Sequence, residues 1–319
     1  MGWTLILAIV LALAAFGVWR WAVAAGSAGT LDWIDARFSR ERAAQMVLQG
    51  RYGPDEAQRV EIWTPTGHDF AEPAPPPGET APPHRYPLVV FIHGGGWHSG
   101  SPEDYRFVAR TLADRGYATA LVGYRLVPGG RWPAMLEDSA VAVRWVRDNA
   151  AKAGVAADNM ILTGHSAGAY NVLMLGLDPQ WLGAAGVPES SIAGVVSLAG
   201  PADFYPWTSD SAVNALGNAQ DPQATQPVNF ARADAPPILL LHGTADDVVR
   251  PKNSAALARA LKAAGGRVQV EEFEGMGHAG IIMALSKPFA QDGKVLDPML
   301  AFMRQPAAAP SVPVQGENR

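Results

Sequence analysis

The stretch Leu162-Thr163-Gly164-His165-Ser166-Ala167-Gly168-Ala169-Tyr170 contains the pattern G-x-S-x-G. The apolar run 159–162 before it is typical of a buried strand, and the pattern of residues 169–175 after it is typical of a helix. Glycines on both sides of a serine allow a turn too tight for side chains. The sequence therefore predicts a nucleophile elbow, a sharp strand–turn–helix that exposes the Ser166 hydroxyl at the helix N-terminus.

A serine hydroxyl is a poor nucleophile unless a base removes its proton and a carboxylate orients that base. The chain contains seven histidines. Six of them lie in or beside a proline-rich segment, in a glycine loop, inside the G-x-S-x-G turn or at the end of a strand. The seventh, His278, lies downstream of every candidate acid and is framed by Gly277 and Gly280. We therefore predict that His278 is the base.

The orienting acid is expected after a strand that lies between the serine and the histidine in the chain. The apolar run 238–241 predicts such a strand, and Asp246 and Asp247 follow it. We assign Asp246 as the catalytic acid, although the pattern does not separate it from its neighbour, which would otherwise cap a turn or be solvated. Asp203 and Asp234 are weaker candidates, because no well-defined strand leads into either of them.

Acyl transfer also requires hydrogen-bond donors for the negative charge that develops on the carbonyl oxygen. Residues 86–92 predict a strand, and His93-Gly94-Gly95-Gly96-Trp97 follows its end. Consecutive glycines expose backbone N–H groups without side-chain obstruction. We therefore predict that the N–H groups of Gly95, Gly96 and Ala167 converge on one oxygen and form an oxyanion hole.

Together these motifs resemble those of the α/β-hydrolases, and more narrowly the esterase/lipase branch with an HGGG loop. The motifs that carry the resemblance lie at 93–97, 164–168, 242–246 and 277–278. That branch includes hormone-sensitive-lipase-like carboxylesterases and kynurenine-formamidase-like enzymes, and residues 51–54 and 60–65 are similar to the opening strands of the latter.

This resemblance covers about residues 50–305 and implies ester hydrolysis without a metal ion or an organic cofactor. It also implies a structural role for Asp138, which would bridge to the region near the elbow. One departure is the proline-rich segment 70–85, which is longer than the fold requires.

Composition excludes several other classes of protein. The 319-residue chain has no cysteine, which excludes disulfides, thiol catalysis and cysteine-based metal sites. Its net charge of −5, without a basic block, argues against nucleic acid as a partner. No P-loop is present, which argues against phosphate chemistry of that kind.

The N-terminal segment 1–29 is expected to be a signal peptide or a membrane anchor, so that the protein is membrane-anchored or exported. Residues 3–25 approach the roughly 20 residues needed to span a bilayer. Small residues at 22–24 fit a cleavage site, whereas the lack of Lys or Arg before the apolar run fits an uncleaved anchor. Arg20 and Arg37 follow the run and favour a cytoplasmic catalytic domain, which conflicts with export.

Residues 30–305 are predicted to form one catalytic domain, followed by a disordered tail at 306–319. Strands alternate with helices, which predicts an α/β fold with a mostly parallel sheet and helices on both faces. A loop is expected at 70–85 and a lid at about 200–235. Strands are expected at 60–63, 86–92, 117–124, 159–163, 192–199, 237–242 and 267–273. Helices are expected at 31–49, 103–115, 134–150, in the elbow, at 252–264 and at 284–303.

Several apolar side chains near the motifs are candidates for a substrate pocket, with an ordinary place in the core as the alternative for each. These candidates are Trp97, Tyr170, Phe204 and Trp207. The amphipathic helix expected at 31–49 would cap the pocket, lie on a membrane or simply pack on the domain.

The motifs favour a serine carboxylesterase that acts on a small-molecule ester. An amidase of the kynurenine-formamidase type would use the same groups. The alternative from outside the enzymes is a membrane-tethered binding module whose hydrolase fold has lost its catalytic activity, since a fold alone does not establish function. Such a module predicts that a fluorophosphonate does not label Ser166.

Overall fold

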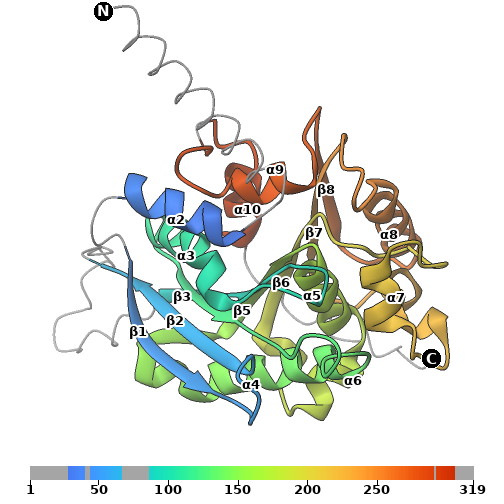
Figure 1. Cartoon of the computed structure of the whole chain (residues 1–319), viewed down its shortest axis with the longest axis horizontal. Coiled ribbons are helices and arrows are strands. Elements are labelled where there is room, and N and C mark those ends of the chain that lie inside the picture. Colours follow the sequence, from blue (N-terminus) through green and yellow to red (C-terminus); the bar gives the residue numbers. More distant parts are fainter. Residues whose placement is uncertain (1–27, 40–43, 67–85, 291, 306–319) are drawn as a thin grey trace, which may run out of the picture.

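The computed structural model describes residues 28–39, 44–66, 86–290 and 292–305. Within these ranges the chain forms an eight-stranded sheet of order β1-β2-β4-β3-β5-β6-β7-β8 (Figure 1). β2 runs antiparallel to both of its neighbours, β1 and β4, and all other neighbouring strands are parallel. The predicted mostly parallel α/β architecture is therefore confirmed. The strands are β1 (Ala44–Arg51), β2 (Arg59–Pro65), β3 (Tyr86–Ile92), β4 (Ala118–Val122), β5 (Val155–His165), β6 (Ile192–Leu198), β7 (Ile238–Gly243) and β8 (Val268–Phe273).

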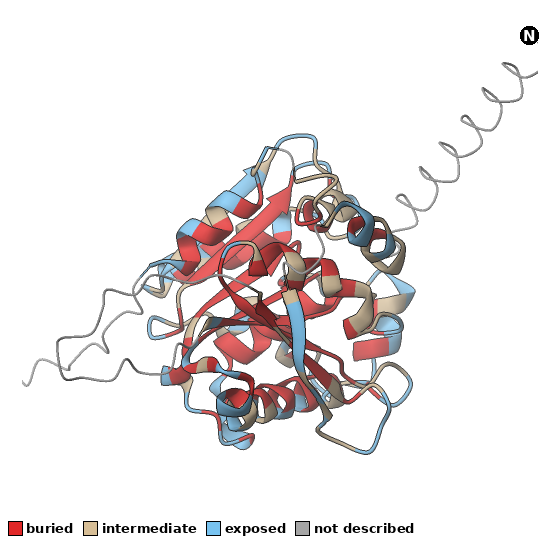
Figure 2. Cartoon of the chain, turned by 90° about the vertical axis from the view of Figure 1, so that its left-hand side faces the viewer, coloured by how far each residue is buried: buried red, intermediate tan, exposed pale blue. Residues whose placement is uncertain are grey.

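Helices cover both faces of the sheet (Figure 1), whose central strands are buried while its edge strands are partly exposed (Figure 2). Successive side chains of a strand point to opposite faces. In β3, Leu88 and Val90 accordingly belong to the core cluster that includes side chains of α4, α5 and α8, whereas Val89 and Phe91 belong to the cluster that includes side chains of α3, α9 and α10. The helices are α2 (Ala28–Phe38), α3 (Arg106–Ala113), α4 (Ala134–Ala153), α5 (Ala167–Leu177), α6 (Pro179–Ala184), α7 (Asp210–Leu216), α8 (Lys252–Ala263), α9 (His278–Met283) and α10 (Leu296–Met303).

The prediction of a helix at 31–49 is wrong over its second half. α2 ends at Phe38, and residues Ala44–Arg51 form the edge strand β1. β1 pairs antiparallel with β2, in a register that places Ala44 opposite Pro65 and Arg51 opposite Arg59. Pairing with a strand that lies later in the chain overrides the local helical pattern, because strand formation depends more on tertiary context than on intrinsic preference.

The prediction of a helix at 284–303 is confirmed only from Leu296 onward, where α10 begins, and is wrong for residues 284–295. The preceding helix, α9, ends at Met283, before the predicted range. Between them, Pro288 has no backbone N–H to donate to a helix. Gly293 has a φ of 65°, a left-handed conformation that does not occur within a right-handed helix.

Three predicted features fall on residues outside the described ranges: the membrane segment 3–25, the proline-rich loop 70–85 and the tail 306–319. Within the ranges that are described, no helix has the length and apolar character needed to cross a bilayer. Membrane attachment and export therefore stay predictions.

A buried carboxylate fixes α2 to the domain. Asp35 is fully buried and accepts hydrogen bonds from Arg110 Nε at 2.8 Å, the Lys287 backbone N–H at 2.7 Å and Ser39 Oγ at 2.9 Å. One turn earlier, Asp32 pairs with Arg110 at 2.7 Å. α2 therefore has a defined position beside α3 (Figure 1) and against the segment after α9.

Asp138 on α4 holds a second buried network together. Its carboxylate accepts hydrogen bonds from the Arg125 side chain and from Gln58 Nε2, each at 2.8 Å, and from the Arg125 backbone N–H at 2.9 Å. These contacts fit a structural role, but they reach the residue before β2 and the segment after β4 rather than the elbow. The next residue, Ser139, makes the link to the elbow helix, because its Oγ accepts from Asn171 at 3.1 Å.

We expect Asp138→Ala to lower the free energy of unfolding by about 2–3 kcal/mol, because Arg125 and Gln58 lose a buried acceptor. Asp148→Ala is the matched control: Asp148 lies on the same helix and forms an exposed pair with Arg144 at 3.2 Å. Exposed pairs contribute only about 0–1 kcal/mol. Urea denaturation followed by circular dichroism measures both variants, and equal losses would contradict the structural role of Asp138.

Candidate active site

Ser166 occupies the sharp turn between the end of β5 and the start of α5. Its φ of 55° and ψ of −118° are strained for a residue with a side chain, and its N–H donates to the carbonyl of Leu198 at 2.9 Å. A Cβ atom on Gly164 would stand 2.5 Å from the Gly168 backbone, and one on Gly168 would stand 2.0 Å from the Ile92 carbonyl oxygen. Close backbone contacts therefore require both glycines of the elbow.

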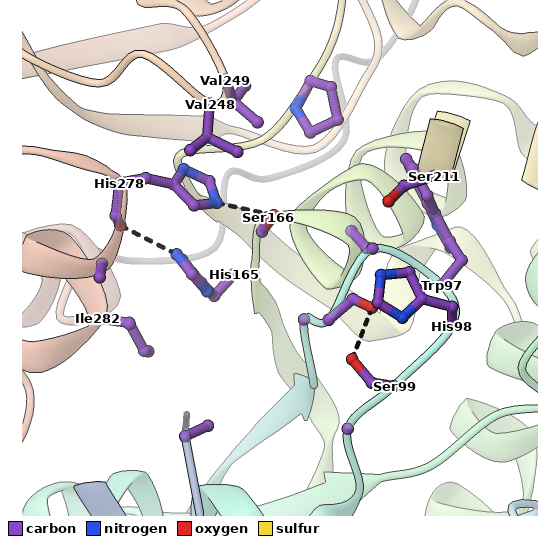
Figure 3. Close-up of a pocket in the computed structure, with 18 of the residues that line it drawn as sticks. Trp97, His98, Ser99, His165, Ser166, Ser211, Val248, Val249, His278 and Ile282 are labelled. Atoms are coloured by element: carbon purple, nitrogen blue, oxygen red, sulfur yellow. Dashed lines mark hydrogen bonds between the residues drawn. The ribbon is translucent and has the colours of Figure 1, made fainter. Parts of the chain in front are cut away.

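His278, the first residue of α9, bonds to Ser166 (Figure 3) and also to Asp246. Its Nε2 lies 2.9 Å from Ser166 Oγ, and its Nδ1 lies 2.7 Å from Asp246 Oδ2. A proton on Nδ1 is donated to the carboxylate, which leaves the lone pair of Nε2 to accept from the Ser166 hydroxyl. The structure thus brings together the three residues that the sequence singled out, in the tautomer that a general base requires.

The Asp246 carboxylate is buried in the loop that follows β7. Its Oδ1 accepts from the backbone N–H groups of Val248 at 3.0 Å and Val249 at 2.8 Å. Burial alone would raise the pKa of Asp246, but the imidazoles of His242 and His278 and the Val249 N–H hold that pKa well below its ordinary value. The carboxylate is therefore ionised at neutral pH and keeps the proton of His278 on Nδ1.

The other aspartates considered from the sequence lie elsewhere. Asp247 is exposed at the edge of the cavity above Ser166, and Asp203 is exposed on the surface. Asp234 pairs with Arg232 at 3.1 Å. Among the contacts of the described residues, none joins these three carboxylates to His278, so the geometry separates Asp246 from its neighbour where the sequence pattern did not.

The glycine loop after β3 lies beside Ser166 and adopts a conformation that side chains disfavour. Gly95 and Gly96 have φ values of 117° and 59°, and a Cβ atom on Gly95 would stand 2.1 Å from the carbonyl oxygen of Ser99. The next residue, Trp97, donates from its indole Nε1 to Oδ1 of Asn171 on α5 at 3.2 Å. This bond ties the loop to the elbow helix and keeps its N–H groups near the helix N-terminus at Ala167.

A cavity of about 990 Å³ opens above Ser166 and is lined by both motifs. Trp97 and Phe204, two of the predicted pocket residues, are among its lining residues. The first turns of the helix expected at 31–49 do contribute to the cavity, as one of its alternatives predicted, because Leu31 and Ile34 of α2 lie in the wall. Sequence reasoning missed the apolar residues of α9: Ala279, Ile282 and Met283.

Two predicted pocket residues are not in the cavity wall. Tyr170 is fully buried in the core, where it meets Trp97 and Phe204 edge to face with ring centroids 5.3 and 5.8 Å apart. It supports the lining residues from behind, because its place one turn into α5 directs it into the packed face of that helix. Trp207 packs against Tyr205 at 5.1 Å, in the segment predicted as a lid. That segment does contribute Phe204, Thr208, Ser209, Ser211 and Ala212 to the cavity wall.

No group of three or more His, Asp or Glu side chains within the described ranges is arranged to hold a metal ion. The Ser166 hydroxyl bonds to the His278 imidazole, and the glycine loop lines the same cavity. The arrangement is suited to nucleophilic attack and to stabilisation of an oxyanion.

Comparison with protein families identifies the chain. The family model BD-FAE matches residues 76–261, which is more than half of the sequence. The chain belongs to the BD-FAE family. The resemblance to α/β-hydrolases of the HGGG esterase type, predicted from the motifs, is confirmed.

Curated relatives include esterases and an amide hydrolase. Esterase LipC of Mycobacterium tuberculosis is 28% identical over 249 residues, which cover 71% of this chain and 58% of LipC. Kynurenine formamidase of Salmo salar is 28% identical over 163 residues, which cover 51% of this chain and 48% of that protein. The chain thus spans less than two thirds of the length of these relatives.

Solved structures share the fold. Esterase B from Lactobacillus rhamnosis superposes with a TM-score of 0.68 at 20% identity, covering 93% of each chain. A truncated carbohydrate esterase from gut microbiota has a TM-score of 0.67 at 20% identity, covering 83% of this chain and 99% of that one. The α/β-hydrolase fold is therefore shared across chains of low identity.

We expect Asp246→Asn to slow the labelling of Ser166 by a fluorophosphonate about 10³–10⁴-fold, because an amide at this position favours the wrong tautomer of His278. Asp247→Asn is the matched control and should label at nearly the wild-type rate. Pseudo-first-order labelling rates, read by intact-protein mass spectrometry, test both variants. A similar loss in the two variants would exclude Asp246 as the specific partner of His278.

Proposed function

We propose that the protein is a serine hydrolase that cleaves carboxylic esters through an acyl-enzyme. One observation carries the proposal: a continuous chain of hydrogen bonds runs from Ser166 Oγ through His278 to Asp246, and it opens on the same cavity as the glycine loop. Esterases among the relatives and among the structures with the same fold support this choice of reaction.

In the first half of the reaction, Ser166 Oγ attacks the ester carbonyl carbon. His278 Nε2 removes the hydroxyl proton as the bond forms, and the resulting imidazolium is stabilised by the ionised Asp246. The carbonyl oxygen becomes an oxyanion, which accepts hydrogen bonds from the N–H groups of Gly95, Gly96 and Ala167. The tetrahedral intermediate collapses when His278 returns the proton to the leaving alcohol, and the acyl group stays on Ser166.

In the second half, a water molecule takes the place of the alcohol. His278 accepts a proton from this water, whose oxygen attacks the acyl carbon and forms a second oxyanion in the same glycine loop. Collapse of this intermediate breaks the bond to Ser166 Oγ, and His278 gives its proton back to the serine. The products are a carboxylic acid and the regenerated enzyme.

An amide substrate of the kynurenine-formamidase type is the second candidate. The observation in its favour is the likeness to the Salmo salar kynurenine formamidase. The same residues would act, with His278 delivering its proton to a leaving amine instead of an alcohol. The mixed wall of the cavity, apolar at α2 and α9 and polar at Ser211 and His98, is compatible with either substrate.

The proposal is tested with the full-length protein and p-nitrophenyl esters from acetate to palmitate. We expect turnover of at least the short esters and a loss of about 10⁴-fold or more in Ser166→Ala, because that variant has no nucleophile. N-formylkynurenine, assayed in parallel, compares amide with ester cleavage.

Each outcome of these assays has a definite meaning. Faster turnover of N-formylkynurenine than of any ester, dependent on Ser166, would replace esterase by amidase. If no substrate reacts and a fluorophosphonate does not label Ser166, the protein is a binding module and the proposal is wrong.

A further inference from the structure

His165, the residue before Ser166, makes an unusual contact for a side chain inside the elbow. It is only 6% exposed, and its Nε2 lies 3.2 Å from the backbone carbonyl oxygen of His278 (Figure 3). The two imidazole rings also pack against each other, with centroids 4.8 Å apart and planes tilted by 37°. His165 therefore touches both the backbone and the side chain of the residue that bonds to Ser166.

The contact defines the tautomer of His165. A carbonyl oxygen can only accept, so Nε2 must carry the proton that joins the two atoms. Nδ1 then holds a lone pair, and this buried atom has no hydrogen-bond partner among the described residues. Burial, and to a lesser extent the charge of His278, lower the pKa of His165 to about 3. His165 thus stays neutral at working pH and remains a donor from Nε2.

Other hydrogen bonds hold the backbone on both sides of His278, and downstream the Gly280 N–H donates to the Gly277 carbonyl at 3.0 Å. Upstream, the loop is pinned where the Gly275 N–H donates to Thr244 Oγ1 at 2.9 Å and where the Ala245 N–H donates to the Met276 carbonyl at 3.0 Å. Beyond Met276 the chain continues through Gly277 and His278 into a helix of only six residues. These bonds hold the chain before and after His278, whereas the His165 side chain acts on the His278 carbonyl itself.

We propose that His165 is a positioning residue for the reaction, which donates a hydrogen bond to the His278 carbonyl and so keeps the His278 imidazole within reach of Ser166. The inference rests on the proposed hydrolase function. A neutral donor is suited to this task, because a cation so close to His278 would oppose formation of the imidazolium. A misplacement of about 1 Å in a proton-transfer group can cost about 10²-fold in rate.

Substitutions at position 165 separate the hydrogen bond from simple packing. His165→Leu and His165→Met fill similar volume without a donor, whereas His165→Gln has an amide N–H₂ at a reach close to that of Nε2. In the full-length protein we expect Leu and Met to lower kcat on a short p-nitrophenyl ester about 10–10²-fold with little change in KM. We expect Gln to recover most of that loss. Thermal melting of each variant accompanies the kinetics.

The outcomes distinguish this inference from the proposed function. Wild-type kcat in the Leu and Met variants, or an equal loss in the Gln variant, would overturn the role of the hydrogen bond. A rise in KM at constant kcat would also overturn it, because His165 would then shape substrate binding. Absence of fluorophosphonate labelling in the wild type would instead overturn the proposed function itself. Fluorophosphonate labelling that is fast in the wild type, slower in the Leu and Met variants and restored in the Gln variant supports both the inference and the proposed function.

Discussion

The closeness of the backbones at the elbow is the constraint on which the rest of the site depends. Gly168 lies so near the Ile92 carbonyl that even a methyl group would stand 2.0 Å from it. This contact presses the start of α5 against the end of β3, where the glycine loop begins. As a result the serine, the helix N-terminus and the glycine loop share one small region. The strained backbone conformation of Ser166 accompanies this close approach.

Features that depend on local sequence could be predicted. The elbow, the glycine loop and the parallel strands each have a signature within about ten residues, because tight turns require glycine and buried strands require apolar runs. Chain order was enough to choose His278, which meets Ser166 across 112 residues. The local signatures agree with one another because the strands they follow all end at the same edge of the sheet.

Features that depend on distant partners could not be predicted. β1 forms because β2 offers it a pairing edge, and Asp246 differs from Asp247 only because the fold buries it beside His278. Tyr170 is an aromatic residue close to the elbow motif, but it lies behind the cavity wall. The rotation of α5 about its axis decides which of its side chains face the cavity. His165 gave no signal beyond its place in the turn, because its acceptor is a backbone atom of a distant segment.

The anchor of α2 has a consequence for protein synthesis. The Asp35 carboxylate at the start of the domain accepts from the Lys287 backbone, 252 residues further along the chain. Proteins are made from the N-terminus, so a ribosome produces the Ser166 elbow well before the segment that carries His278 and Lys287. The nascent chain accordingly holds a serine without its base and a cavity without a fixed wall. In the proposed mechanism, Ser166 therefore stays unactivated until the segment with His278 has been synthesised and has folded against the elbow.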